Sequence, residues 1–402
     1  MGSNSRQGAV NVPTKHFVAL DSWRGVCALL VAVFHFPASG ILASTPFIKH
    51  SNLFVDFFFV LSGFVIAANY FDRIKDVGAI GRFMWLRIGR LYPLHIAILA
   101  AFLLIELAKL AGVIPGGEAF AGDRSTDTIL TNAFLVHSLG MHADASWNRP
   151  SWSISCEMFA YLAFAMATLL GGRKRWIAYG ALMLLSLGML ISFSEVYLVS
   201  TAKFGAFRAL LGFFAGVFCW RAWASLEDRA DSLGGSRFWT CVEAAMLVAV
   251  VTFVSMTGVS PANFAAPVIF FATVLVFSLE RGALSRFAMR PSLTYLGRLS
   301  YSLYMIHFLI MTVGLKMFRV LESKMGWDLT HVSSKGLYLF GADGLTSDLL
   351  TLPYVALVII ASHFTYEYIE KPGRDFFRSL SPKPKKPDTV ALKKARLTSA
   401  SS

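Results

Sequence analysis

Residues 52–71 read NLFVDFFFVLSGFVIAANYF, a run of twenty residues in which Asp56 is the single charged side chain. A bilayer core of about 30 Å is crossed by roughly 20 apolar helical residues, so this run is typical of a transmembrane span. The whole chain shares this character, because 55% of its 402 residues are hydrophobic, 15% are charged and the mean hydropathy is +0.58. A chain this apolar has no room for a large soluble domain.

Nine further apolar runs lie between polar breaks, at 17–37, 91–112, 151–171, 176–198, 204–222, 239–258, 263–280, 295–314 and 349–369. The predicted fold class is therefore all-α: a polytopic membrane helix bundle with about ten transmembrane helices. If the N-terminus is cytoplasmic, 26 of the 37 Lys and Arg residues fall on the cytoplasmic side, with Arg221 and Arg298 at the cytoplasmic ends of their runs included, and 8 fall on the other. This asymmetry predicts that both termini are cytoplasmic.

The chain divides into three predicted parts. Residues 1–16 form a polar tail, residues 17–370 a membrane domain, and residues 371–402 a basic tail that we expect to be disordered and close to lipid. The net charge of +13 comes from short clusters between apolar runs, which indicates a membrane rather than nucleic acid as the partner. The four cysteines lie in or beside apolar runs, so no metal site is expected.

Ionisable side chains inside spans are energetically expensive, and each is therefore a functional hypothesis. Arg24 and His35 are eleven residues apart, which places them on one helical face and about 16 Å apart along the axis. An arginine near the cytoplasmic end can hold an anion, and a histidine deeper in the span can move a proton near neutral pH. The structural alternative is a pair of buried residues that only stabilise helix packing.

Two arginines precede the third span. Arg87 and Arg90 are spaced i and i+3, so on a helix they share a face. Paired guanidinium groups suit bidentate phosphate binding, but positive-inside topology and anionic lipid explain the same residues.

Two carboxylates within spans require partners. Glu157 could share a proton with His35 as half of a general-base pair, or it could close a structural ion pair with Arg208. Asp56 also needs a partner, and the neighbouring Gly63 allows a second helix to approach closely, which favours a packing role.

The ninth span carries the run SYSLYMIH at residues 300–307, which is rich in hydroxyls for a helix in lipid. Tyr304 and His307 are neighbours at i and i+3 and must face the bundle interior. They either line a cavity or form interhelical hydrogen bonds.

Six motifs in order together resemble the acyltransferase 3 family, polytopic membrane enzymes that O-acylate surface and secreted carbohydrates. They are LDSWRG followed by His35, FVDFFFVLSGF, Arg87-x-x-Arg90-Leu91-Tyr92-Pro93, WSISCE, LGRLSYSLYMIH and the terminal YEYIEKPGR. The resemblance covers nearly the whole chain. Leu86 departs from it, because an arginine often stands there in the family.

The resemblance implies an acyl-coenzyme A donor, acetyl in the first instance, which enters from the cytoplasm as a co-substrate, with no bound cofactor. Arg87 and Arg90 match positions implicated in holding the donor, and Arg24 and His35 match an essential pair. The hypothesis that follows makes His35, oriented by Glu157, the base that deprotonates a sugar hydroxyl.

The remaining roles complete this hypothesis. Arg24 joins His35 and Glu157 as catalytic, Tyr304 and His307 join the donor site, and Asp56 and Arg208 are supporting residues. The expected partners are acyl-coenzyme A, a carbohydrate or glycolipid acceptor and the lipid bilayer, in a plasma or bacterial inner membrane.

A proton-coupled transporter or flippase is the rival function, because carriers also use buried Arg, His, Glu and Asp. A membrane subunit without catalytic function is a second rival, but the order of the motifs argues against both. The acceptor, the acyl chain length and the oligomeric state stay open.

Overall fold

The computed structural model describes residues 16–114, 117–333 and 336–381. Nine segments of this part are long and apolar enough to cross a membrane, and one of them, 149–193, contains two helices. The spanning helices are thus α1 (Val18–His35), α4 (Phe54–Tyr70), α5 (Val77–Leu110), α7 (Trp152–Gly171), α8 (Arg175–Phe193), α9 (Gly205–Leu226), α11 (Ser236–Thr257), α12 (Ala266–Ser278), α14 (Pro291–Met325) and α15 (Gly344–Thr365). The predicted all-α bundle with about ten spans is confirmed.

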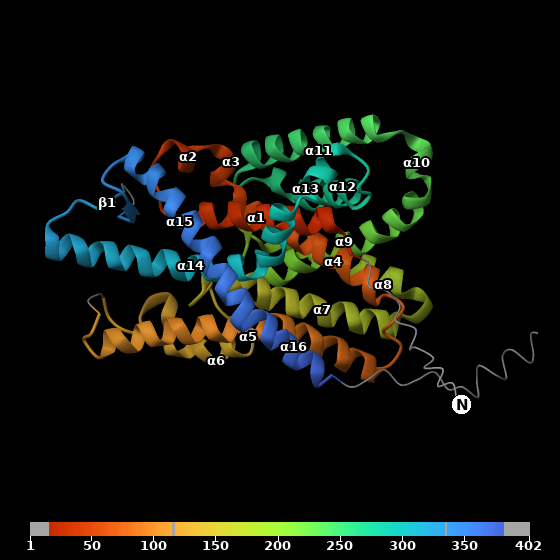
Figure 1. Cartoon of the computed structure of the whole chain (residues 1–402). Helices are drawn as coiled ribbons and strands as arrows, with labels where there is room; N and C mark the ends of the chain where they lie inside the picture. Colours follow the sequence, from red (N-terminus) through yellow and green to blue (C-terminus); the bar gives the residue numbers. More distant parts are fainter. Residues whose placement is uncertain (1–15, 115–116, 334–335, 382–402) are drawn as a thin grey trace, which may run out of the picture.

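Short elements lie between these helices and after the last of them. They are α2 (Ile41–Ser44), α3 (Pro46–Lys49), α6 (Ile129–Ala133), α10 (Ala230–Leu233), α13 (Ala283–Ala288), α16 (Lys371–Ser379) and an antiparallel hairpin of β1 (Thr330–Val332) and β2 (Tyr338–Phe340). In Figure 1, α1 and α4 run through the middle of the bundle, with α11 to α13 on one side and α5 on the other. The most extensive contacts join α1 to α14 and α4 to α9, so these four helices form the centre.

Glycines allow α4 and α9 to pack backbone against backbone. A Cβ atom added to Gly63 would lie 1.8 Å from the carbonyl oxygen of Phe213, and one added to Gly216 would lie 1.9 Å from that of Val60. Gly212 and Gly216 form a Gly-x-x-x-Gly pattern, which is typical of closely packed membrane helices. The close approach predicted for the helix that contains Gly63 is thus confirmed.

Replacing Gly63 by alanine is expected to destabilise the bundle by about 1–3 kcal/mol, because the new methyl group overlaps the α9 backbone. The measurement is the apparent unfolding temperature in detergent. Gly188→Ala is the matched control, since Gly188 lies in α8 with no atom within 4 Å of an added Cβ. Equal unfolding temperatures for the two variants would contradict this account of the α4–α9 contact.

The chain past residue 370 differs from the prediction of a disordered tail. Residues 371–379 form α16, which lies along α5. The indole Nε1 of Trp85 donates a hydrogen bond of 2.8 Å to the carbonyl oxygen of Phe377, and the Phe377 side chain lies against Gly89. The prediction is wrong for this stretch because the packing partner lies almost 300 residues earlier. The rest of that tail, 382–402, and residues 1–15 lie outside the described residues.

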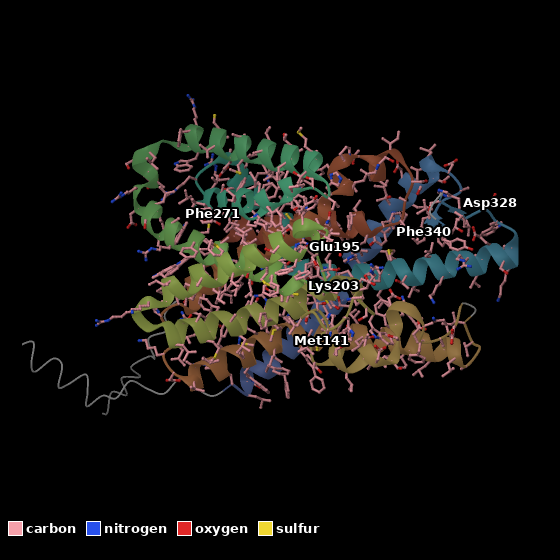
Figure 2. The ribbon with its side chains drawn as sticks, turned by 180° about the vertical axis from the view of Figure 1, so that it is seen from behind. Met141, Glu195, Lys203, Phe271, Asp328 and Phe340 are labelled. Atoms are coloured by element: carbon pink, nitrogen blue, oxygen red, sulfur yellow. The ribbon has the colours of Figure 1, made fainter. Side chains whose placement is uncertain are left out.

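The hairpin closes the far end of α1. Phe340 of β2 lies inside the fold (Figure 2), where its ring stacks on that of Phe36 with centroids 4.7 Å apart. The ring of Tyr354, in α15, also stacks on the ring of Phe36, with centroids 4.4 Å apart. These contacts hold the residue that follows His35.

Candidate active site

Two adjoining cavities lie among the central helices and share part of their lining. The larger, which we call the basic chamber, has a volume of about 650 Å³ and is lined by six arginines: Arg24, Arg87, Arg90, Arg298, Arg374 and Arg378. The smaller, which we call the narrow chamber, has a volume of about 100 Å³ and is lined mainly by apolar, hydroxyl and aromatic side chains of α4, α7 and α14. Three of the arginines, Arg24, Arg87 and Arg90, line both cavities and therefore mark the junction between them.

The two ends of the described chain meet at the basic chamber. His16 and Arg378 both line it, which places them at the same end of the bundle, as an even number of spans requires. The imidazole of His16 hydrogen-bonds to Asp21, with 2.8 Å between Nε2 and Oδ2, and this contact raises the pKa of His16 above its ordinary value. Asp21 and Glu370 are the two carboxylates that line the chamber, so its arginines outnumber its acids.

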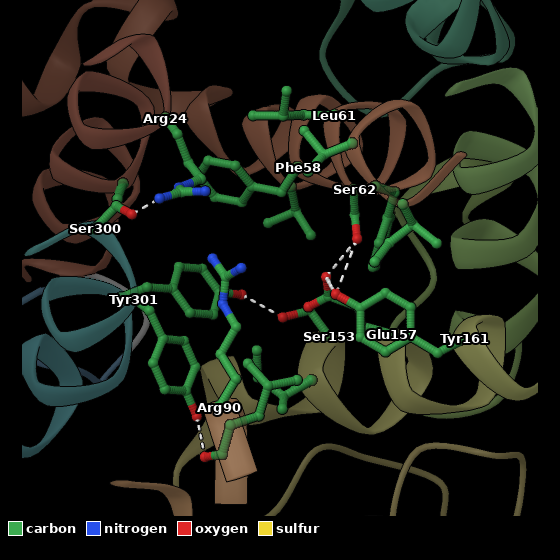
Figure 3. A pocket seen from close by; sticks show the side chains of 18 of the residues that line it. Arg24, Phe58, Leu61, Ser62, Arg90, Ser153, Glu157, Tyr161, Ser300 and Tyr301 are labelled. Atoms are coloured by element: carbon green, nitrogen blue, oxygen red, sulfur yellow. Dashed lines mark hydrogen bonds between the residues drawn. The ribbon is translucent and has the colours of Figure 1, made fainter. Parts of the chain in front are cut away.

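Arg24 is held firmly on α1. Its Nε donates to Ser300 Oγ at 2.8 Å, Nη2 donates to the Gly297 carbonyl oxygen at 3.2 Å, and Nη1 lies 3.1 Å from Asp21 Oδ1. The close contact of α1 with α14 makes these bonds possible. Figure 3 shows the guanidinium groups of Arg24 and Arg90 pointing into the narrow chamber from two sides.

Arg87 and Arg90 share one face of α5, as predicted. Arg87 donates to the Tyr70 hydroxyl at 3.2 Å and lies over the ring of the same tyrosine. Within the described part of the chain, Arg90 forms neither a hydrogen bond nor an ion pair. Its guanidinium group is thus available to a ligand in either chamber.

Glu157 does not contact the partners that the sequence suggested. Its carboxylate accepts hydrogen bonds from Ser62 Oγ at 2.6 Å and from the Tyr161 hydroxyl (Figure 3). Pairing with His35 or with Arg208 is therefore wrong as a structural prediction. Glu157 instead lines the narrow chamber, where it faces the junction arginines.

A buried ion pair joins Asp56 to Arg208. Arg208 donates from Nε to Asp56 Oδ1 at 2.8 Å and from Nη2 to Oδ2 at 2.7 Å, and both side chains are about 1% exposed. Arg208 also lies over the ring of Trp152. This bidentate geometry gives Asp56 its required partner and fits the supporting role predicted for both residues.

His35 pairs with His307. Nδ1 of His35 lies 2.9 Å from the Val31 carbonyl oxygen, and Nδ1 of His307 lies 3.2 Å from that of Leu303. Because a carbonyl oxygen can only accept, each Nδ1 carries a hydrogen when its ring is neutral. Nε2 of His307 lies 3.3 Å from Nδ1 of His35 and presents its lone pair to that N–H, whose one hydrogen is therefore shared between the Val31 carbonyl oxygen and His307.

This arrangement sets the tautomer of His35. Its Nε2 atom keeps a lone pair, and no described residue hydrogen-bonds to it. A neutral imidazole with an open Nε2 is the form that a general base requires. The side chain that contacts His35 is therefore that of His307, in place of the predicted Glu157.

Tyr304 lies between the narrow chamber and the two histidines. It lines the chamber, and its ring centroid is 5.9 Å from that of His307. Its hydroxyl donates to the Pro150 carbonyl oxygen at 3.0 Å and lies 2.9 Å from Ser153 Oγ. Of the predicted donor-site residues, Arg87, Arg90 and Tyr304 line the chambers, whereas His307 contacts His35.

Sequence reasoning missed the three outer arginines, Arg298, Arg374 and Arg378. Two of them lie in motifs that were visible, LGRLSYSLYMIH and YEYIEKPGR, but their role as chamber residues depends on how α14 and α16 meet α5.

Within the described residues, no group of three or more His, Cys, Asp or Glu side chains could hold a metal ion.

Comparison with known proteins gives a family and two relatives. The acyltransferase domain of the acyltransferase 3 family matches residues 17–368. Acyltransferase MdmB of Streptomyces mycarofaciens is 32% identical over 117 residues, which cover 29% of this chain and 28% of that protein. Protein 2 in picA locus of Rhizobium radiobacter is 29% identical over 214 residues, 48% of this chain and 98% of that protein. No solved structure matches.

Proposed function

The chain belongs to the acyltransferase 3 family, and we propose that it transfers an acyl group, acetyl in the first instance, from acyl-coenzyme A to a hydroxyl of a carbohydrate or glycolipid. The donor enters from the cytoplasmic face of a plasma or bacterial inner membrane. The excess of Lys and Arg on the side of the basic chamber supports this orientation.

The observation that carries the proposal is that the basic chamber adjoins the narrow one and shares three arginines with it. Coenzyme A joins a polyanionic nucleotide to a slender, uncharged pantetheine arm. A chamber with six arginines suits the phosphates, because guanidinium groups form charge-assisted, often bidentate hydrogen bonds with them. The narrow chamber, lined by residues such as Phe58, Val65 and Tyr304, suits the arm and its acyl group.

We assign the proton transfer to His35 and His307, which lie beyond Tyr304 and outside the lining of the narrow chamber. Nε2 of His35 accepts the proton of the acceptor hydroxyl while the hydroxyl oxygen attacks the thioester carbonyl carbon. The tetrahedral intermediate then expels the coenzyme A thiolate, so a C–O bond forms and the C–S bond breaks. The proton passes from His35 to the thiolate, which leaves as the thiol.

His307 assists by accepting a hydrogen bond from Nδ1 of His35, which stabilises the imidazolium that forms after proton transfer. Because His35 ends α1 and Arg24 lies about 16 Å back along the helix, the acceptor has to approach from the side opposite the donor. Such an arrangement allows a cytoplasmic donor to modify an acceptor outside the membrane.

The test is binding of radiolabelled acetyl-coenzyme A to the protein in nanodiscs. Replacing Arg90 by glutamine is expected to weaken binding by about ten- to a hundredfold, because a charged hydrogen bond to phosphate is lost. Arg237→Gln is the control, since Arg237 is exposed at the start of α11 and lines neither chamber. If the native protein neither binds nor slowly hydrolyses acetyl-coenzyme A, the proposed donor is wrong.

A further inference from the structure

The arginines of the basic chamber fall into two groups. Arg24, Arg87 and Arg90 lie at the junction with the narrow chamber, whereas Arg298, Arg374 and Arg378 line the basic chamber alone. We call the second group the outer arginines. This separation means that two anionic groups of one ligand can be held at different distances from the narrow chamber.

The outer arginines lie on well-anchored elements. Arg374 and Arg378 are at i and i+4 of α16, so they share a face. The bond from Trp85 and the contact of Gly373 with Pro93 hold α16 against α5, which carries the junction arginines. The α16 pair is therefore fixed in position relative to Arg87 and Arg90.

The outer arginines also keep charge available for a ligand. Arg298, the eighth residue of α14, lies over the ring of Tyr295 and has no carboxylate within ion-pair distance among the described residues. Arg374 contacts Asp375, whose side chain is 52% exposed, at 3.2 Å. Exposed pairs of this kind contribute little energy and can be exchanged for a phosphate at small cost.

The order of the groups along coenzyme A matches the order in which the two arginine groups follow one another outward from the narrow chamber. When the thioester and the pantetheine arm occupy the narrow chamber, the diphosphate follows at the junction. The 3′-phosphate of the adenosine lies beyond the diphosphate, farther from the arm. As a phosphomonoester it carries a charge of about −1.5 to −2 at pH 7, which is more than either diphosphate group carries.

We propose that Arg298, Arg374 and Arg378 recognise the 3′-phosphate of the donor and so select coenzyme A against nucleotides that lack this group. This inference rests on the proposed function, because it assumes that the donor is an acyl-coenzyme A. It assigns the junction arginines to the diphosphate and the outer arginines to specificity for the nucleotide.

The experiment compares the affinities of acetyl-coenzyme A and acetyl-3′-dephospho-coenzyme A in nanodiscs. The native protein is expected to bind the complete donor about ten- to a hundredfold more tightly. In the double variant Arg374→Gln, Arg378→Gln, affinity for acetyl-coenzyme A should fall toward that for the dephospho donor, and affinity for the dephospho donor should not change. That unchanged affinity also demonstrates that the variant is folded.

Arg90→Gln provides the matched comparison, because it should lower the affinity for both donors by the same factor and keep the native preference for acetyl-coenzyme A. The double lysine variant, Arg374→Lys with Arg378→Lys, should retain part of the preference since it keeps the charge. A native protein that binds both donors equally overturns the 3′-phosphate assignment and leaves the proposed function intact. The assignment is also overturned if the glutamine double variant loses affinity for both donors by the same factor. A native protein that binds neither donor refutes the proposed function itself.

Discussion

Replacement of His35 by alanine is expected to lower kcat for acetyl transfer by about 10²–10⁴-fold and to leave the Kd for acetyl-coenzyme A unchanged. The loss follows from removing the open Nε2 lone pair, which is the proposed acceptor of the hydroxyl proton. Affinity is preserved because His35 lines neither the basic nor the narrow chamber. The measurements are hydrolysis or transfer of labelled acetyl groups, and equilibrium binding of the donor to the same preparations.

Variants of His307 separate positioning from proton transfer. His307→Ala should lower kcat less than His35→Ala does, because His35 keeps its Nε2 atom and its bond to the Val31 carbonyl. His307→Gln should recover part of the lost rate, since an amide oxygen can also accept a hydrogen bond from Nδ1 of His35. A His35→Ala protein that retains more than about a tenth of the native kcat would exclude His35 as the general base.

Removing Arg208 is expected to destabilise the protein by about 3–5 kcal/mol, because Arg208→Met leaves the Asp56 carboxylate buried without its counter-ion. The double variant Asp56→Leu, Arg208→Met should recover most of this loss, since two apolar side chains do not need the missing partner. The measurement is unfolding in detergent by heat or denaturant, followed by the near-ultraviolet signal of the buried aromatic residues.

The control for this pair is Asp231→Asn, which breaks the Arg281–Asp231 contact at the surface. These side chains are 36% and 74% exposed, so the change should alter stability by less than about 1 kcal/mol. If Arg208→Met is no more destabilising than Asp231→Asn, the ion pair is not a main stabilising contact of the bundle. If Arg208→Met lowers acetyl transfer by a larger factor than it lowers the amount of folded protein, Asp56 has a further role in the reaction.

Much of the site could be predicted from single residues, but their partners could not. A charged side chain in an apolar run has to be paired, and this rule identified Asp56, Glu157 and Arg208. The rule does not say which residues pair, and both partners suggested for Glu157 were wrong. The arrangement of α4, α7 and α9 placed Ser62 and Tyr161 beside Glu157 and Asp56 beside Arg208.

The end of the membrane domain illustrates the same difference. The composition of residues 371–402 favours a solvated tail, and nothing local in it predicts a packed helix. Residues 371–379 nevertheless form α16, because Phe377 packs against Gly89 and accepts a hydrogen bond from Trp85. A contact between residues so distant in sequence is not encoded in the local pattern of either segment.

The sequence by itself determined the membrane bundle, its approximate number of spans and its family, because span length, hydropathy and motif order are properties of the chain read along its length. Only the tertiary structure decided which ionisable groups meet: His35 with His307, Asp56 with Arg208, and six arginines around one chamber. The physical reason is that a buried polar group can satisfy its hydrogen bonds with any suitable neighbour. Which neighbour is present depends on helix packing, and close contacts such as Gly63 against Phe213 set that packing.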